Sequence, residues 1–208
     1  MSAISVAVVV VAATVACSRA PTAGFWYQED ALTFPADVGA RLGGPLTSEE
    51  MASIEQLSRA EVERAFAGLR ISVTRSERAF WRVTVLRSLP TRRSTDRPHA
   101  GESLAMGFLG GSGAVGFDFV VFQAVHFASP DESRQDTIEG IGRGVGRVAV
   151  HEFMHQILGA SIADNVIDAD SYEYGRPNRR SQYYGELHWT TAWPLLQRQF
   201  GRGTVPLR

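Results

Sequence analysis

Hydrophobic and polar residues first follow a clear helical period over residues 48–69. Thr47-Ser48 can cap the first turn of this amphipathic helix, and Glu49 and Glu50 suit the positive end of the helix dipole. Residues 58–61 form a second capping-box pattern, so a break at that point is an alternative. The pattern therefore predicts one long early helix or two shorter ones.

Two later segments, residues 70–75 and 80–86, alternate apolar and polar side chains. This period of two is typical of half-buried strands, and we expect both in one sheet. A glycine cluster over residues 107–116 precedes the apolar run 117–125, which we interpret as strand-like. Because neither a helix nor a Gly-Lys-Ser/Thr sequence follows it, the cluster does not fit a nucleotide-binding loop. We predict a flexible turn or an edge segment there.

A second long helix is predicted over residues 133–158. Asp131 or Ser133 can cap its start, and Gly159 follows its last apolar residues as a C-terminal glycine does. The three glycines within residues 142–146 lie inside this helical pattern and do not follow a strand. They therefore favour close helix packing over a dinucleotide site.

Composition is that of an ordinary globular domain. The 208 residues include 21 basic and 22 acidic side chains, and 44% are hydrophobic. These values exclude collagen, coiled coil and wholesale disorder, and the balanced charge argues against a nucleic-acid-coating protein. We expect one α+β domain over residues 25–208, in which a twisted mixed β-sheet packs against both long helices and a small helical part follows.

The N-terminal residues have the pattern of an export signal. Residues 3–16 are apolar but too few to span a bilayer, which needs about 20 residues, so we interpret residues 1–16 as a leader. Thr14-Val15-Ala16-Cys17-Ser18 resembles a bacterial lipobox, in which the cysteine is acylated. The resemblance implies lipidation at Cys17, a tether over residues 17–24, and a place in the cell envelope, facing the periplasm from the outer membrane or at the cell surface.

The second long helix ends with His151-Glu152-Phe153-Met154-His155, an H-E-x-x-H sequence. Residues four apart share a helix face, so two imidazoles can bind one ion. Glu152, beside the first histidine, is placed to take a proton from an attacking water. The pattern predicts one Zn²⁺ ion bound by His151 and His155, with Glu152 as general base.

This motif resembles that of the zincin metallopeptidases, with a metzincin-like continuation to Gly159. The specific match covers residues 151–159, and the order of helix, strands, glycine-rich edge and motif helix is also similar. The resemblance implies a zincin-like fold and a peptide or protein substrate. It further implies that residues 110–117 border the cleft and pair with an extended peptide.

The third zinc ligand is not fixed by the spacing. Metzincins take it from beyond a glycine turn, which favours Asp164, nine residues after His155. Gluzincins take a glutamate from a later helix, and a third histidine is another option. The alternatives are Glu186, Glu173, His188, Asp168 and Asp170.

Aromatic residues are dense in the C-terminal region. Trp189, Trp193, Leu196 and Phe200 recur at helical spacing, which predicts core packing. The resemblance also implies a donor across the cleft that stabilises the oxyanion, and spacing does not select it. The candidates are Tyr172, Tyr174, Tyr183, Tyr184 and His188.

These patterns together predict a zinc-dependent hydrolase, a cell-envelope metallopeptidase in which Glu152 assists the attack of water on a peptide bond. One alternative is a zinc amidase acting on cell-wall material. Another is a non-catalytic envelope lipoprotein that serves as a binding module. We expect no nucleic-acid partner and membrane contact only through the lipid anchor, and the sequence does not predict an oligomeric state.

Overall fold

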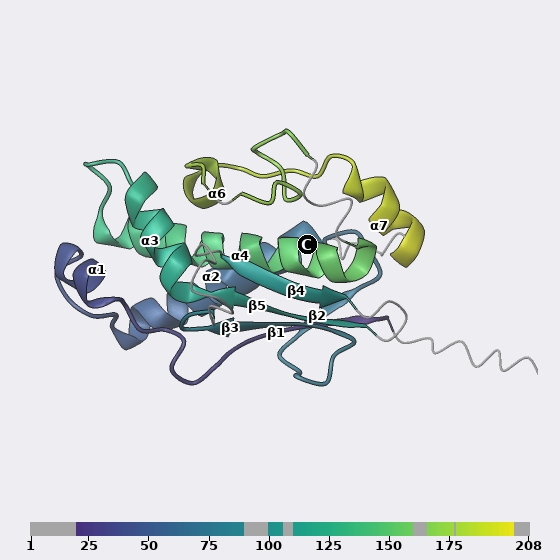
Figure 1. Ribbon diagram of the computed structural model, residues 1–208, viewed down its shortest axis with the longest axis horizontal. Coiled ribbons are helices and arrows are strands. Elements are labelled where there is room, and N and C mark those ends of the chain that lie inside the picture. Colours follow the sequence, from purple (N-terminus) through teal and green to yellow (C-terminus); the bar gives the residue numbers. More distant parts are fainter. Residues whose placement is uncertain (1–19, 90–99, 106–109, 160–165, 177, 202–208) are drawn as a thin grey trace, which may run out of the picture.

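The computed structural model describes residues 20–89, 100–105, 110–159, 166–176 and 178–201. These residues form a mixed α/β fold in which helices pack on a five-stranded, mostly parallel sheet (Figure 1). The predicted mixed sheet, the two long helices and the small helical C-terminal part are confirmed. Within the described ranges, no helix has the length and apolar character needed to cross a membrane.

The sheet has the strand order β2-β1-β3-β5-β4. Its strands are β1 (Thr22–Tyr27), β2 (Ser72–Thr74), β3 (Trp81–Leu86), β4 (Gly101–Ala105) and β5 (Gly111–Gly116). Pairing is parallel from β2 through β5, and β4 runs antiparallel to β5. The edges of this sheet are therefore β2 and β4.

The helices are α1 (Ala36–Arg41), α2 (Ser48–Ala65), α3 (Phe117–Phe127), α4 (Arg134–Leu158), α6 (Ser181–Tyr184) and α7 (Ala192–Phe200). Helix α4 packs on β3, β4 and β5, and α2 packs along α4. The segment with α6 and α7 lies on the other side of α4 from the sheet (Figure 1). The motif helix is therefore a middle layer between the sheet and the C-terminal segment.

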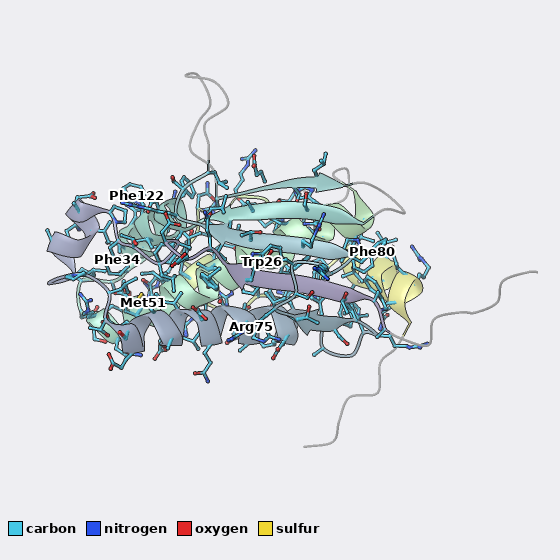
Figure 2. All side chains as sticks on the ribbon, turned by 90° about the horizontal axis from the view of Figure 1, so that it is seen from below. Trp26, Phe34, Met51, Arg75, Phe80 and Phe122 are labelled. Carbon is cyan, nitrogen blue, oxygen red and sulfur yellow. The ribbon has the colours of Figure 1, made fainter. Side chains whose placement is uncertain are left out.

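Side-chain alternation explains how the sheet contributes to the core. In β3, Trp81, Val83 and Val85 are buried, whereas the residues between them are half-buried. Figure 2 shows the face of the sheet opposite α4, with the strands in front of the helix and Trp26 of β1 labelled. One face of the sheet therefore builds the core with the helices, as the period of two predicts.

Close approach of α2 to α4 depends on glycines. A Cβ at Gly142 would lie 2.9 Å from the Leu57 Cβ, and one at Gly146 would lie 2.5 Å from the Ser58 carbonyl oxygen. The predicted role of these glycines in helix packing is confirmed. Helix α2 is continuous through residues 58–61, and the capping box that forms is the one between Thr47 and Glu50.

Residues 117–125 are helical, so their interpretation as a strand was wrong. They belong to α3, in which Val120, Val121 and Ala124 are fully buried at helical spacing. The segment is apolar at nearly every position, so neither period stands out in the sequence. Packing of α3 on α4 decides the conformation.

The glycine cluster and the N-terminal tether also differ from expectation. Residues 111–116 form β5, which pairs with β3 on one side and β4 on the other, so the edge strand is β4. Residues 110–117 therefore cannot offer a free edge to a peptide, since both neighbours of β5 are already paired. Strand β1 begins at Thr22, so Thr22–Gly24 belong to the sheet and not to a tether.

Candidate metal centre

The two motif histidines face each other near the C-terminal end of α4. Their Nε2 atoms are 3.0 Å apart, and the ring planes are nearly perpendicular, at 89°. Two ligands held at 2.0–2.1 Å from one tetrahedral Zn²⁺ stand about 3.3 Å apart. A shift of a few tenths of an ångström would therefore fit His151 and His155 to one zinc ion.

A hydrogen bond to the main chain orients His151. Its Nδ1 lies 3.2 Å from the carbonyl oxygen of Tyr172. A carbonyl oxygen only accepts, so Nδ1 must donate a proton. In the neutral ring, Nε2 then carries the lone pair, and it points at His155. Zinc-binding histidines commonly have such a bond from the other ring nitrogen.

Glu152 lies on the sheet side of the motif. The residue is buried, with 4% of its surface exposed. A Cβ at Gly101 would lie 2.3 Å from its Oε1, so the carboxylate packs against the first residue of the edge strand β4. Ser103 of β4 also donates to the Glu152 carbonyl oxygen at 3.0 Å. The predicted general base therefore lies where the edge strand meets the motif helix.

The favoured third ligand, Asp164, lies outside the described residues, so it stays a prediction. Gly159 does end α4, with a φ of +85°, and its N–H donates to the His155 carbonyl oxygen. The chain therefore turns at the predicted residue. Among the residues that the structure describes, no three His, Cys, Asp or Glu side chains gather as a metal site requires.

The two glutamates considered as alternative zinc ligands form contacts away from the histidines. Glu173 is fully buried and accepts from the main-chain N–H groups of Thr190 and Ala192, which places it at the start of α7. Glu186 has 87% of its side chain exposed and pairs with Arg64 at 3.3 Å. The structure therefore brings neither glutamate to the histidine pair.

Three more of the candidate ligands contact one another in the C-terminal segment. His188 Nε2 lies 2.9 Å from Asp168 Oδ2, and both side chains are largely exposed. The other oxygen of Asp168 accepts from the N–H of Asp170. These residues stabilise a turn of the C-terminal segment, and none joins His151 and His155 in a group of three.

Most of the tyrosines considered for oxyanion stabilisation are buried or bonded elsewhere. The Tyr172 hydroxyl donates to Glu61 Oε1 at 2.9 Å, and the Tyr184 hydroxyl donates to the Ala124 carbonyl at 2.8 Å. Burial raises the pKa of Tyr184 to about 12. Tyr183 is fully buried, and burial raises its pKa as well. Among the tyrosines, half-buried Tyr174 is the remaining candidate.

A buried ion pair beside the motif was not predicted from the sequence. Arg147 lies one helical turn before His151, and its Nε is 3.0 Å from Glu61 Oε1 of α2. The two side chains have 1% and 3% of their surfaces exposed. A charged residue four positions before His151, on the same helix face, was the available signal in the sequence.

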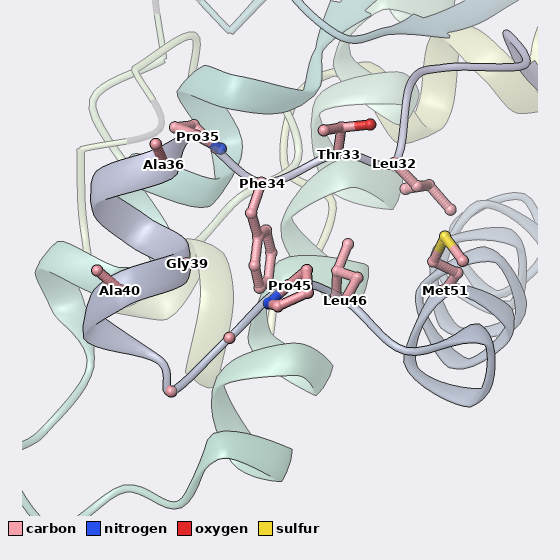
Figure 3. Close-up of a pocket in the computed structure, with 12 residues that line it drawn as sticks. Leu32, Thr33, Phe34, Pro35, Ala36, Gly39, Ala40, Pro45, Leu46 and Met51 are labelled. Atoms are coloured by element: carbon pink, nitrogen blue, oxygen red, sulfur yellow. The ribbon is translucent and has the colours of Figure 1, made fainter.

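An apolar hollow of about 560 Å³ lies far from this centre, between α1 and the first turn of α2 (Figure 3). Phe34, Leu46 and Met51 line it, and no ionisable side chain does. Arg134 at the start of α4 donates to the Pro45 carbonyl beside it. Since 17 residues of α4 separate Arg134 from His151, the hollow is about 25 Å from the motif along the helix axis.

Cys17, the expected lipidation site, also lies outside the described residues. Its acylation and the envelope location therefore stay predictions. Comparison of the chain with models of protein families, with curated proteins and with solved structures found no match.

Proposed function

We propose that this protein is a zinc-dependent peptidase of zincin type. His151 and His155 supply two ligands, Asp164 the third, and Glu152 is the general base. The observation that carries the proposal is the hydrogen bond from His151 Nδ1 to the Tyr172 carbonyl. It presents Nε2 of His151, as a lone-pair donor, to the neighbouring Nε2 3.0 Å away. Two ordinary core histidines do not require this arrangement.

The side chains suit hydrolysis of a peptide bond. When bound, a zinc ion polarises the substrate carbonyl and makes a water molecule easier to deprotonate. Glu152 accepts a proton from the water whose oxygen attacks the carbonyl carbon. It then passes a proton to the leaving nitrogen as the carbon–nitrogen bond breaks, so the products are a carboxylic acid and an amine.

The edge strand favours a peptide over a cell-wall amide as substrate. Among the described strands, β4 pairs with β5 alone, and Gly101 at its start packs against Glu152. An extended peptide can add to the open edge of such a strand through its main chain. That arrangement would hold a scissile bond beside Glu152. Strand β4 thus takes the role first expected of residues 110–117.

Chain length permits Asp164 to serve as third ligand. It lies five residues after Gly159, and such a stretch spans at most about 18 Å when extended. The turn at Gly159 follows His155 by a single helical turn. A bound metal therefore needs no change in the described helix for a carboxylate from this segment to reach it.

Zinc content and Glu152→Gln test the proposal together. We expect zinc bound to the purified protein by elemental mass spectrometry, lost in His151→Ala and reduced in Asp164→Ala. Glu152→Gln should retain zinc but hydrolyse unstructured protein substrates about 10²–10⁴-fold more slowly. Glu139→Gln, on the same helix, is the matched control. A folded protein that takes up no zinc, or full hydrolysis by Glu152→Gln, would contradict the proposal.

A further inference from the structure

A buried polar cluster joins α2, α4 and the C-terminal segment beside the motif. Its members are Glu61, Arg147 and the Tyr172 hydroxyl, with Arg64 at its outer side. Buried charges are retained in proteins when they are paired and hydrogen-bonded, and this cluster meets both conditions. Arg147 also donates to the Ser181 and Gly185 carbonyl oxygens, at 2.7 and 2.8 Å.

Tyr172 is the member that connects the cluster to the histidines. Its hydroxyl donates to Glu61 at 2.9 Å, and its carbonyl accepts from His151 Nδ1 at 3.2 Å. Its N–H donates to the His188 carbonyl at 3.0 Å, and its ring packs against Trp189. The position of the carbonyl that orients His151 is therefore fixed from three sides.

The hydrogen bond between Tyr172 and Glu61 is supported by its surroundings. Burial, followed by the nearby Glu61 carboxylate, raises the pKa of the Tyr172 hydroxyl, so it remains a donor. Arg147 and Arg64 also donate hydrogen bonds to the two carboxylate oxygens of Glu61. The Glu61–Tyr172 bond is thus a charge-assisted hydrogen bond, stronger than a bond between neutral groups.

We propose that Glu61 and Tyr172 are positioning residues for the metal site. Glu61 holds the Tyr172 hydroxyl, and the Tyr172 carbonyl holds His151 in the tautomer and orientation that present Nε2 to a metal ion. Neither residue touches the metal or the substrate. The inference rests on the proposed function, because it assigns α2 a part in zinc affinity beyond its packing on α4. Outer partners of metal-bound histidines change metal affinity in this manner.

Tyr172→Phe, compared with Tyr27→Phe, tests the inference. The Tyr27 hydroxyl forms a hydrogen bond of 2.7 Å with Ser58 Oγ, and Ser58, like Glu61, belongs to α2. This bond includes neither Tyr172 nor His151. Each variant removes one hydroxyl that binds this helix. Zinc affinity is measured by competition with a chromophoric chelator. The tautomer of His151 in the metal-free protein is read from its imidazole ¹⁵N shifts.

We expect Tyr172→Phe to weaken zinc binding about tenfold and to mix the His151 tautomers. Tyr27→Phe should bind zinc as the unchanged protein does and keep one tautomer. If both variants lose affinity equally, or neither does, the positioning role is wrong while the metal site stands. If the unchanged protein binds no zinc, both proposals fail, so the two failures are distinguishable.

Discussion

The polar groups that stabilise the two ends of α4 differ in how deeply they are buried. At the N-terminal end, Ser133 and Asp136 form an exposed capping box, and Arg134 donates to Glu50 and to the Pro45 carbonyl. At the C-terminal end, the ionisable residues from Arg147 onward are buried or half-buried. The same helix is thus held by a half-buried ion pair at its N-terminal end and by an almost fully buried one near its C-terminal end.

The two ends of α4 therefore contribute to the protein in different ways. The Arg134–Glu50 pair keeps 29% and 14% of its two side chains exposed, so water still screens it in part, and losing one charge there costs less than at the buried end. A buried charge must keep its partners, so the C-terminal contacts leave few arrangements open to His151 and Glu152. We infer that the C-terminal contacts orient the motif side chains, whereas the N-terminal contacts fix where the helix begins.

Arg147→Ala should have the largest effect on the stability of the protein. It removes the partner of buried Glu61 and leaves the Ser181 and Gly185 carbonyl oxygens without their donor. Loss of one partner of a buried pair lowers the free energy of unfolding by about 3–5 kcal/mol. Urea denaturation measures this value. Arg143→Ala, one turn earlier, removes a half-buried side chain that donates to the Tyr183 carbonyl and pairs with partly exposed Glu139. It should lower the value by about 1 kcal/mol, and equal losses would refute the contrast.

Gly101→Ala tests the sheet side of the same end. The added methyl group would lie 2.3 Å from Glu152 Oε1, so the carboxylate or β4 must move. We expect unfolding free energy to fall by about 1–3 kcal/mol and hydrolysis to fall far more than zinc content. Gly39→Ala is the control, since its nearest neighbour would be 3.7 Å away. Full activity in Gly101→Ala would mean that Gly101 does not fix the position of the Glu152 carboxylate.

The sequence predicted α4 well because its signals are local. Of the two expected caps, Asp131 and Ser133, the structure uses Ser133, and the helix ends at Gly159 as expected. The H-E-x-x-H spacing likewise predicted that His151 and His155 share a face, since a helix turn alone brings them together. Their 3.0 Å separation is consistent with that prediction.

What the sequence did not predict depends on contacts between distant segments. The acceptor for His151 comes from Tyr172, and the space for Glu152 comes from Gly101. Both depend on how the sheet and the C-terminal segment meet α4, which no local pattern encodes. The assignment of the edge to residues 110–117 was wrong for the same reason. A glycine-rich strand looks like an edge in sequence, yet β5 uses Gly111 and Gly113 to admit Gln156 of α4.

Glu50→Gln changes the N-terminal end of α4. Of these variants, it should have the smallest effect on the free energy of unfolding. Glutamine can keep the capping box with Thr47, but its amide nitrogen cannot accept from Arg134, so the variant removes the charge and one of the two hydrogen bonds from Arg134. The Arg134 hydrogen bond lowers the pKa of Glu50 in the folded protein.

A lowered pKa stabilises the fold above the unfolded value of about 4.3, and this stabilisation is lost as the pH falls through the folded value. The unchanged protein should therefore exceed Glu50→Gln in unfolding free energy by about 1 kcal/mol at pH 7, with the gap closing as the pH falls below the unfolded value. Denaturation at several pH values measures the gap, and zinc affinity should be the same in both proteins. A gap independent of pH would rule out the charge as its source. Weaker zinc binding would show that the N-terminal end of α4 also orients the histidines.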